Sequence, residues 1–375
     1  MPAPILPSTP TAYAGIDARA STIVPAPTIH DEHAVLPCPS AAVRPFFALA
    51  LAGAVLLGLA GILTGCAPAA ATPPARLALN ASTWTDSLAV WRTQRLSEIA
   101  GADGWSTVTG LVWLDEREQW TIGTGSTAHV RLLRDHVPAD VGLVQVTGRV
   151  VRFRAAPAAP VTRLVHAPAA NAPQRLPVDS LTLNDDKQPE PSVLAVGSVT
   201  LRLIERSGRL ALRVKDSLAD ARVHFAGLDY FANDSALRVP AQLLPGAPGD
   251  SVTIINILGQ TEHFFSPGTL QFTVAGVALS LRAVREPSDT TRLFILFRDH
   301  TSADATYPAG RFIYAVVPGV DGWTVLDFNR AFNPPCAFTA FATCPLPPRE
   351  NQLQLRIEAG ERRYAGRHRV AVAER

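Results

Sequence analysis

Short apolar runs separated by turn-forming residues dominate the sequence from Thr107 to Glu358. Each run is rich in Val, Leu, Ile, Phe and Thr, and Gly, Pro, Asn or Asp stands between them. About a dozen such runs at short spacing are typical of β-sandwiches and barrels, whereas a parallel α/β fold needs a helix-length segment between strands. We therefore expect a mainly β protein. The predicted strands are Thr107–Trp113, Ala128–Leu133, Val141–Val146, Val150–Arg154, Ser198–Ile204, Leu210–Val214, Val252–Leu258, Leu270–Val274, Val277–Arg282, Leu293–Phe297, Arg311–Val316, Thr324–Phe328 and Leu353–Glu358.

One amphipathic helix is predicted ahead of the strands, over Thr85–Ala100, and Gly101 can end it. Arg95 and Glu98 are expected to face water. The residues that recur at helical spacing, on the other face of the helix, are Leu88, Trp91, Arg92, Leu96 and Ile99.

The strand pattern divides into two β-sandwich or barrel-like modules, which we expect to join near Glu205–Arg209. Residues 84–205 would then hold the helix and a first β module. Residues 206–375 would form a C-terminal β module.

An export signal is predicted before the helix. Arg44 precedes an uncharged apolar run, Phe46–Leu63, which ends in Leu-Thr-Gly-Cys66. A positive start, an apolar stretch and small residues before a cut describe such a signal. The last four residues resemble the bacterial lipobox, in which the cysteine is acylated and the chain is cleaved before it. The alternative is an uncleaved transmembrane helix, since about 18 residues just span a bilayer core.

We therefore expect residues 43–65 to be a lipoprotein signal peptide, Cys66 to be lipidated, and residues 66–83 to be a tether. The partner implied is a membrane, on the periplasmic or extracellular face of the cell envelope. Residues 1–42 fit poorly ahead of this signal because they are rich in Pro and Ala and contain acidic side chains. Met1 is the sole methionine and Val43 suits an alternative start codon, so residues 1–42 are expected to be an untranslated or disordered extension.

Charge and motif content exclude several function classes. The chain has 34 basic and 32 acidic side chains and a net charge of +2, which is not the basic excess of a dedicated nucleic-acid binder. The sequence contains no Walker A, H-E-x-x-H, G-x-S-x-G or C-x-x-C motif. We predict no cofactor, no metal site and no nucleic-acid partner.

Two cysteines, Cys336 and Cys344, lie close together in a proline-rich loop. Outside the cytoplasm such a pair predicts first a structural disulfide. The alternative is a functional thiol site.

Polar residues gather around the predicted strand ends between residues 299 and 330, where binding groups tend to lie. An Asp299–His300 pair can act as a general base. The structural alternative is a capped turn, with Arg311 paired to Asp327 across neighbouring strands. The candidate ligand-binding residues are Asp299, His300, Tyr307, Arg311, Asp327 and Asn329.

Six segments carry a resemblance to a known family. They are Gly104–Leu114, Ile122–Gly123, Leu212–Asp216, Ser266–Gly268, Thr306–Phe312 and Leu326–Pro348. In this order they resemble motifs of the bacterial DUF1684 family, and the match runs from about Trp84 to Gly360. The family name denotes unknown function, so the resemblance implies no activity. Because the family includes proteins without export signals, the resemblance weighs against a purely structural disulfide.

These observations favour a membrane-anchored lipoprotein of the DUF1684 type that serves as a small-molecule or protein binding module, or as a structural module. The alternative is a hydrolase-like or thiol-dependent enzyme with its site between residues 299 and 344.

Overall fold

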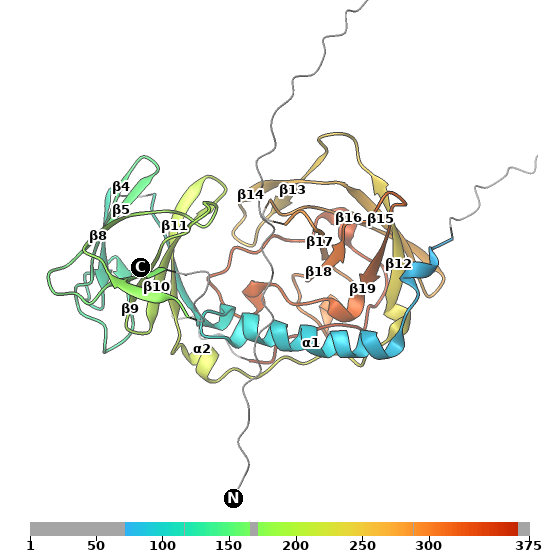
Figure 1. Ribbon diagram of the computed structural model, residues 1–375, viewed down its shortest axis with the longest axis horizontal. Helices are drawn as coiled ribbons and strands as arrows, with labels where there is room; N and C mark the ends of the chain where they lie inside the picture. Colours follow the sequence, from blue (N-terminus) through green and yellow to red (C-terminus); the bar gives the residue numbers. More distant parts are fainter. Residues whose placement is uncertain (1–71, 116, 166–171, 288, 367–375) are drawn as a thin grey trace, which may run out of the picture. The chain divides into compact units, whose positions relative to one another are not determined.

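The computed structural model describes residues 72–115, 117–165, 172–287 and 289–366. This part of the chain is mainly antiparallel β structure without a closed barrel, and one long helix lies near its start (Figure 1). The predicted fold class is confirmed. The helices are α1 (Ala81–Ala100) and the short α2 (Asp220–Val223).

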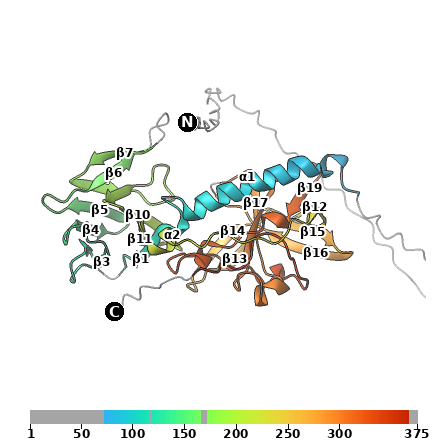
Figure 2. The ribbon, with the colours of Figure 1, turned by 90° about the horizontal axis from the view of Figure 1, so that it is seen from below.

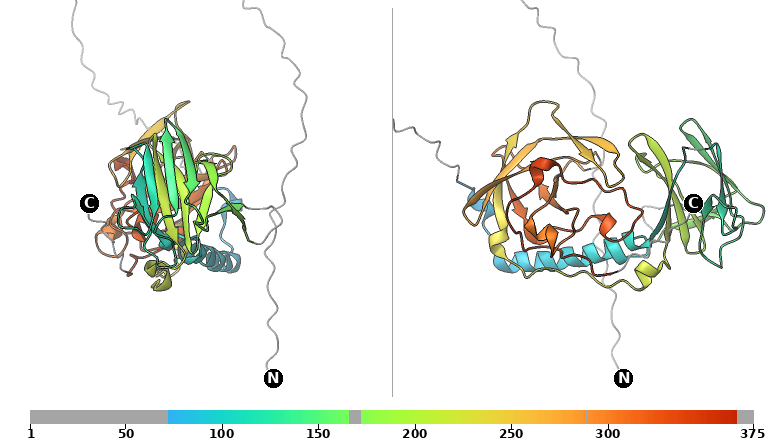
Figure 3. Two further views of the ribbon diagram at one scale, coloured as in Figure 1. Left: turned by 90° about the vertical axis from the view of Figure 1, so that its left-hand side faces the viewer. Right: turned by 180° about the vertical axis from the view of Figure 1, so that it is seen from behind.

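Two facing sheets form a first sandwich (Figure 3). Side chains alternate along each strand, so that in β5 Val151 and Phe153 are buried while Arg152 and Arg154 are exposed. One sheet has the order β1 (Val108–Trp113), β11 (Arg209–Asp216), β10 (Val199–Arg206), β9 (Val193–Val196), β6 (Thr162–Val165), β7 (Gln174–Pro177). The other has the order β3 (Val130–Arg131), β2 (Gln119–Gly123), β4 (Gly142–Thr147), β5 (Val150–Ala155), β8 (Ser180–Leu183).

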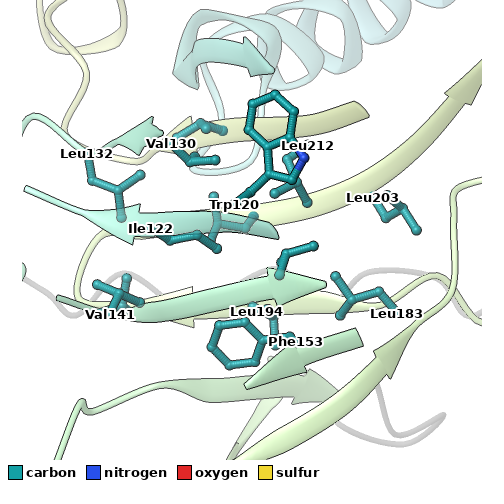
Figure 4. Close-up of a cluster of buried hydrophobic side chains, with 14 of the residues drawn as sticks. Trp120, Ile122, Val130, Leu132, Val141, Phe153, Leu183, Leu194, Leu203 and Leu212 are labelled. Carbon is teal, nitrogen blue, oxygen red and sulfur yellow. The ribbon is translucent and has the colours of Figure 1, made fainter. Parts of the chain in front are cut away.

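The two sheets share one hydrophobic core. Figure 4 shows Trp120 and Phe153 from one sheet beside Leu194 and Leu212 from the other. At about 25 cal/mol per Å² of buried apolar surface, aromatic and aliphatic side chains of this size account for most of the stability of such a sandwich.

The expected join at Glu205–Arg209 lies at the turn of the β10–β11 hairpin, where Arg206 pairs with Arg209. Both strands belong to the same sheet, and β11 also pairs with β1. The first sandwich therefore continues to Asp216.

A second module contains a four-stranded sheet and two hairpins. The sheet has the order β16 (Val277–Ala283), β15 (Gly268–Val274), β12 (Arg238–Pro245), β19 (Trp323–Asp327). The hairpins are β13 (Ser251–Ile255) with β14 (Thr261–Phe265), and β17 (Arg292–Phe297) with β18 (Arg311–Val316).

The β17–β18 hairpin is buried on both faces. Leu293 and Ile295 point into the core shared with the four-stranded sheet, whereas Phe294 and Leu296 point into a second core with Cys336. This double burial explains why both strands are nearly continuous apolar runs.

Helix α1 precedes the first sandwich in sequence but packs along the second module (Figure 2). The Asn80 side chain caps its first turn by accepting from the Thr83 amide. Leu88 and Ile99 are buried as predicted, but the expectation that Arg95 faces water is wrong.

Arg95 is 4% exposed, whereas Leu96 is 44% exposed. The Arg95 guanidinium donates to Glu361 Oε1 at 2.8 Å and lies 4.5 Å from the centre of the Phe332 ring. A carboxylate and an aromatic face together compensate for burial of the cation, which helical periodicity alone does not reveal.

Among the described residues, neither helix has the length and apolar character needed to cross a bilayer. The apolar run Phe46–Leu63 and Cys66 lie outside the described residues.

Candidate functional site

Asp299 and Arg311 form a buried ion pair. Arg311 Nη2 lies 3.3 Å from Asp299 Oδ1 and donates to the carbonyl oxygen of Ile357 at 2.9 Å. Asp299 also accepts from the Ile357 amide at 2.7 Å and from the Thr301 hydroxyl. Neither charged side chain reaches solvent. The pair therefore ties β18 to the segment around Ile357.

The predicted Asp299–His300 base is not assembled. The His300 side chain is exposed, and its Nε2 lies 3.3 Å from Gln354 Oε1. The Asp299 carboxylate is directed instead to Arg311 and to the groups around it.

Asp327 and Asn329 lie together, because Asn329 Nδ2 donates to Asp327 Oδ1 at 3.0 Å. The Arg311–Asp327 pair expected in the structural alternative is not formed, because both residues have other partners. Asp327 accepts from Trp84 Nε1 at 2.8 Å and lies 3.4 Å from Arg330 Nε. Helix α1 supplies this tryptophan, so the Asp327–Asn329 group secures the helix to the second module.

Tyr307 lies beside the cysteine loop, defined here as residues 336–344. Its hydroxyl donates to the carbonyl oxygen of Cys336 at 3.2 Å. Cys336 and Cys344 are both buried free thiols, so the predicted structural disulfide is not present. The Cys336 amide donates to Cys344 Sγ at 3.1 Å, which shows how closely the loop brings the two residues together.

The candidate ligand-binding residues therefore fall into three separate buried groups: the Asp299–Arg311 pair, the Asp327–Asn329 pair and Tyr307 with the cysteines. His300 lies on the surface. Within the described residues these contacts do not bring the groups to one cavity.

A pocket of about 800 Å³ lies elsewhere, between the edge of the first sandwich and the cysteine loop. Its walls come from residues 131–134, from α2 and its flanking residues, from residues 338–341 and from Tyr364. The Thr339 hydroxyl donates to the carbonyl oxygen of Val108 at 2.9 Å, which fixes the loop against β1 at the pocket wall. The lining includes the hydrophobic side chains of Leu133, which is exposed, and Phe341, which is half-buried; those of Leu132, Val214 and Phe338 are buried behind them.

One acidic group in the pocket is already satisfied. Asp216 accepts from Arg134 Nε, from the Ser198 hydroxyl at 2.7 Å and from the Leu218 amide at 2.9 Å. Burial acts to raise the pKa of Asp216, but these hydrogen bonds outweigh it and hold the pKa below its ordinary value.

The side chains of Arg131, Asp220 and His224 also line the pocket. All three are exposed, and within the described part of the chain the structure gives their side chains no hydrogen bond or ion pair. They are therefore available to a ligand.

Sequence reasoning missed this pocket because its residues come from six separate stretches of the chain. One signal was present: three of the segments that carry the DUF1684 resemblance, Gly104–Leu114, Leu212–Asp216 and Leu326–Pro348, contain residues that line the pocket.

Comparison with known proteins supports the family resemblance and adds no activity. The model of the DUF1684 family, described as a protein of unknown function, matches residues 223–362. No curated protein matches the chain. One solved structure, a solution NMR structure of an uncharacterised protein from Haloarcula marismortui, is 34% identical and covers 38% of this chain and 78% of its own, with a TM-score of 0.32. The matched residues comprise the second module and the cysteine loop, and through them the chain belongs to the DUF1684 family.

Proposed function

We propose that this protein binds a small amphiphilic molecule in the pocket between the first sandwich and the cysteine loop. The observation that carries the proposal is the pocket itself. Its volume of about 800 Å³ lies within the range of known small-molecule sites, which is roughly 300–1,000 Å³.

The lining suits a ligand with an apolar body and polar ends. Leu133 and Phe341 offer apolar contact area, because both line the pocket and neither is buried, whereas Arg131 and Asp220 offer opposite charges. A few polar groups in a mainly apolar cavity are the usual means by which a site fixes the orientation of its ligand. The two formal charges balance, so the pocket does not favour a strongly charged ligand.

The fluorescent probe 1-anilinonaphthalene-8-sulfonate tests the pocket, because it has an apolar ring system and one anionic group. We expect one saturable site in the wild-type protein. Ala340→Trp should abolish it, because Ala340 lines the pocket, is exposed, and can carry an indole into the cavity without disturbing the core.

Ala278→Trp is the matched control. Ala278 is likewise exposed, on strand β16, and does not line the pocket. The proposal fails if both variants bind the probe like the wild type, or if the wild type shows no saturable site. Melting curves without probe must show that both variants remain folded.

We further propose that the protein is a lipoprotein held on the cell envelope through Cys66. The support is the sequence Leu-Thr-Gly-Cys66 at the end of an uncharged apolar run. Two acyl chains on a cysteine-linked diacylglycerol would give the two-chain attachment that stable anchoring requires.

Expression of the full chain and of Cys66→Ser tests the anchor. The wild-type protein should partition with membranes and begin at an acylated Cys66, while the variant should accumulate as an uncleaved precursor. Intact peptides spanning residues 46–66 in the mature wild-type protein would instead show an uncleaved membrane helix.

A further inference from the structure

Three arginines are buried in the described part of the chain, and two of them have a carboxylate partner. Arg95 is bonded to Glu361, and Arg311 pairs with Asp299. Arg213 of strand β11 is only 7% exposed, yet the described residues offer its side chain no hydrogen bond and no ion pair. A buried cation is costly without an anion beside it, so Arg213 is the exception that needs an explanation.

The unused donors of Arg213 form one edge of its guanidinium. They are Nε and Nη2, which are both buried and have no partner within this part of the chain. The N–H bonds on this edge run parallel, which is the geometry that binds two oxygens of one carboxylate or phosphate group. In the same part of the chain, Arg282 and Arg311 each lack a partner for Nε alone. Arg213 therefore presents a complete two-point binding edge for an oxyanion.

A second arginine lies directly opposite Arg213 in the sheet. Arg202 of β10 is its partner in the antiparallel register, so both side chains leave the same face, with Cβ atoms roughly 5 Å apart. Arg202 Nη2 donates to Asp103 Oδ2 at 2.6 Å, but Arg202 Nε is buried and has no partner in the described ranges. Like charges in directly opposed positions repel, so an anion bound between the two arginines would relieve the repulsion.

The carboxylates near Arg213 are already engaged by other cations. Asp186 acts on the charge of Arg213, but it pairs with Arg206 at 2.7 Å. Asp103 is shared between Lys215 and the arginine opposite. Within the described residues these four cations thus share two carboxylates, and two positive charges are left over. Burial lowers the pKa of Arg213 to about 10, so its side chain is still positive at neutral pH.

Trp105 covers a different part of the guanidinium. The central carbon of the Arg213 guanidinium lies 5.1 Å from the centre of the Trp105 ring, and Trp105 is half-buried. A cation–π contact uses the flat face of the guanidinium, so the Nε–Nη2 edge can still donate to an anion that lies in the guanidinium plane. Because Arg213 is almost fully buried, the anion must be small.

We propose that Arg213 and Arg202 bind a small dianionic oxyanion of the phosphate class, which accepts from the Nε–Nη2 edge of Arg213 and from Nε of Arg202. A phosphate group carries about 1.5 to 2 negative charges at neutral pH, so it matches the two surplus positive charges better than a monocarboxylate does. Neither arginine lines the ligand pocket, so this proposal and the pocket proposal stand or fall separately.

Calorimetric titration of the full chain with inorganic phosphate tests the site, at an ionic strength held constant with sodium chloride. We expect one saturable phosphate site in the wild-type protein. Arg213→Met keeps the apolar stem but removes the two edge donors, so it should weaken phosphate binding at least about tenfold. Arg213→Lys keeps the charge without the parallel donors and should weaken binding less than Arg213→Met.

Arg209→Met is the matched control. Arg209 lies on the same strand, and its guanidinium is likewise close to a tryptophan, at 4.3 Å from the ring centre of Trp113. It is exposed, however, and it pairs with Asp115. Phosphate affinity should therefore be unchanged in Arg209→Met.

The choice of anion tests the ligand class. Acetate should bind the wild-type protein at least about tenfold more weakly than phosphate, because it carries a single charge. Phenyl phosphate distinguishes the two sources of the group: weaker binding than inorganic phosphate indicates a free anion, whereas tighter binding indicates a phosphate monoester. Both results support the site.

Melting curves in chloride must show that each variant is folded. If Arg213→Met does not fold, Arg202→Gln provides the second test, because it changes a half-buried position and should also weaken phosphate binding. The absence of a saturable phosphate site in the wild type would overturn the proposal. So would wild-type affinity in the folded Arg213 or Arg202 variant, an equal loss of affinity in Arg209→Met, or acetate binding as tight as phosphate binding.

Discussion

Replacing Asp299 by asparagine should destabilise the protein far more than the same replacement at Asp304. Both carboxylates pair with an arginine, Asp299 with Arg311 at 3.3 Å and Asp304 with Arg356 at 3.1 Å. The first pair is completely buried, whereas the side chains of the second pair are 42% and 61% exposed. The comparison therefore isolates the effect of burial on one type of ion pair.

The magnitude at Asp299 follows from what asparagine keeps. Its amide oxygen can still accept from the Ile357 amide, now bonded at 2.7 Å, and its size is unchanged. What disappears is the negative charge facing Arg311. Breaking a buried pair on one side costs about 3–5 kcal/mol, and the retained hydrogen bond places the loss near 3 kcal/mol. For a cooperative unit of roughly 150–250 residues, that corresponds to a fall of about 6–12 °C in melting temperature.

Urea unfolding followed by tryptophan fluorescence measures both variants. Asp304→Asn should leave the midpoint essentially unchanged, because solvent screens the exposed pair. The double variant Asp299→Asn with Arg311→Met should lose less unfolding free energy than the two single variants lose in sum, because it removes both buried charges. Equal midpoints for Asp299→Asn and Asp304→Asn would refute the idea that this buried pair stabilises the second module.

Three further expectations can be measured in the same way. Trp84→Phe removes the 2.8 Å hydrogen bond to the Asp327 carboxylate and should cost about 1.5–3 kcal/mol in unfolding free energy, while an unchanged midpoint would contradict the role assigned to it. Gly360→Ala should lower the free energy of unfolding much more than Gly259→Ala. Both glycines have a positive φ, 76° and 78°, but a Cβ at Gly360 would lie 2.4 Å from the carbonyl oxygen of Ala331, whereas a Cβ at Gly259 would meet no atom within 4 Å. Asp216 has a pKa below its ordinary value of 3.8, so its contribution is complete above the unfolded pKa and is lost as pH falls through the folded pKa; Asp216→Asn should flatten the loss of stability below about pH 4, and an unchanged acid profile would contradict this.

The fold class could be predicted from the sequence because each strand carries its own signal. Leu293–Phe297 and Arg311–Val316 are apolar enough to be recognised without knowledge of their neighbours, and both are strands. The position of α1 could not be predicted in this way. In the sequence, Arg95 is a charged helix residue of the kind that normally faces water. Its burial is explained only by Glu361, which lies far away in the chain and accepts a hydrogen bond from it.

The candidate site shows the same limit. Asp299, Arg311 and Asp327 were predicted as candidate ligand-binding residues, whereas the structure gives them partners around Ile357 and Trp84 that no local pattern connects to them. The pocket could not be predicted from the sequence for the same reason. Its lining residues become neighbours only after the first sandwich and the cysteine loop have packed together.

The Arg95–Glu361 contact has a consequence for how the chain folds. The two residues are 266 positions apart, and joining them closes a loop whose entropic cost is about 5 kcal/mol, apart from a constant term. Contacts of such high sequence separation slow folding. This contact forms only after Glu361 has been synthesised, and a product shortened before Glu361 would leave Arg95 with the largely exposed carboxylate of Glu98 in place of the buried one. The Arg95 side of α1 is therefore expected to pack late in folding, after the end of the second module has been synthesised.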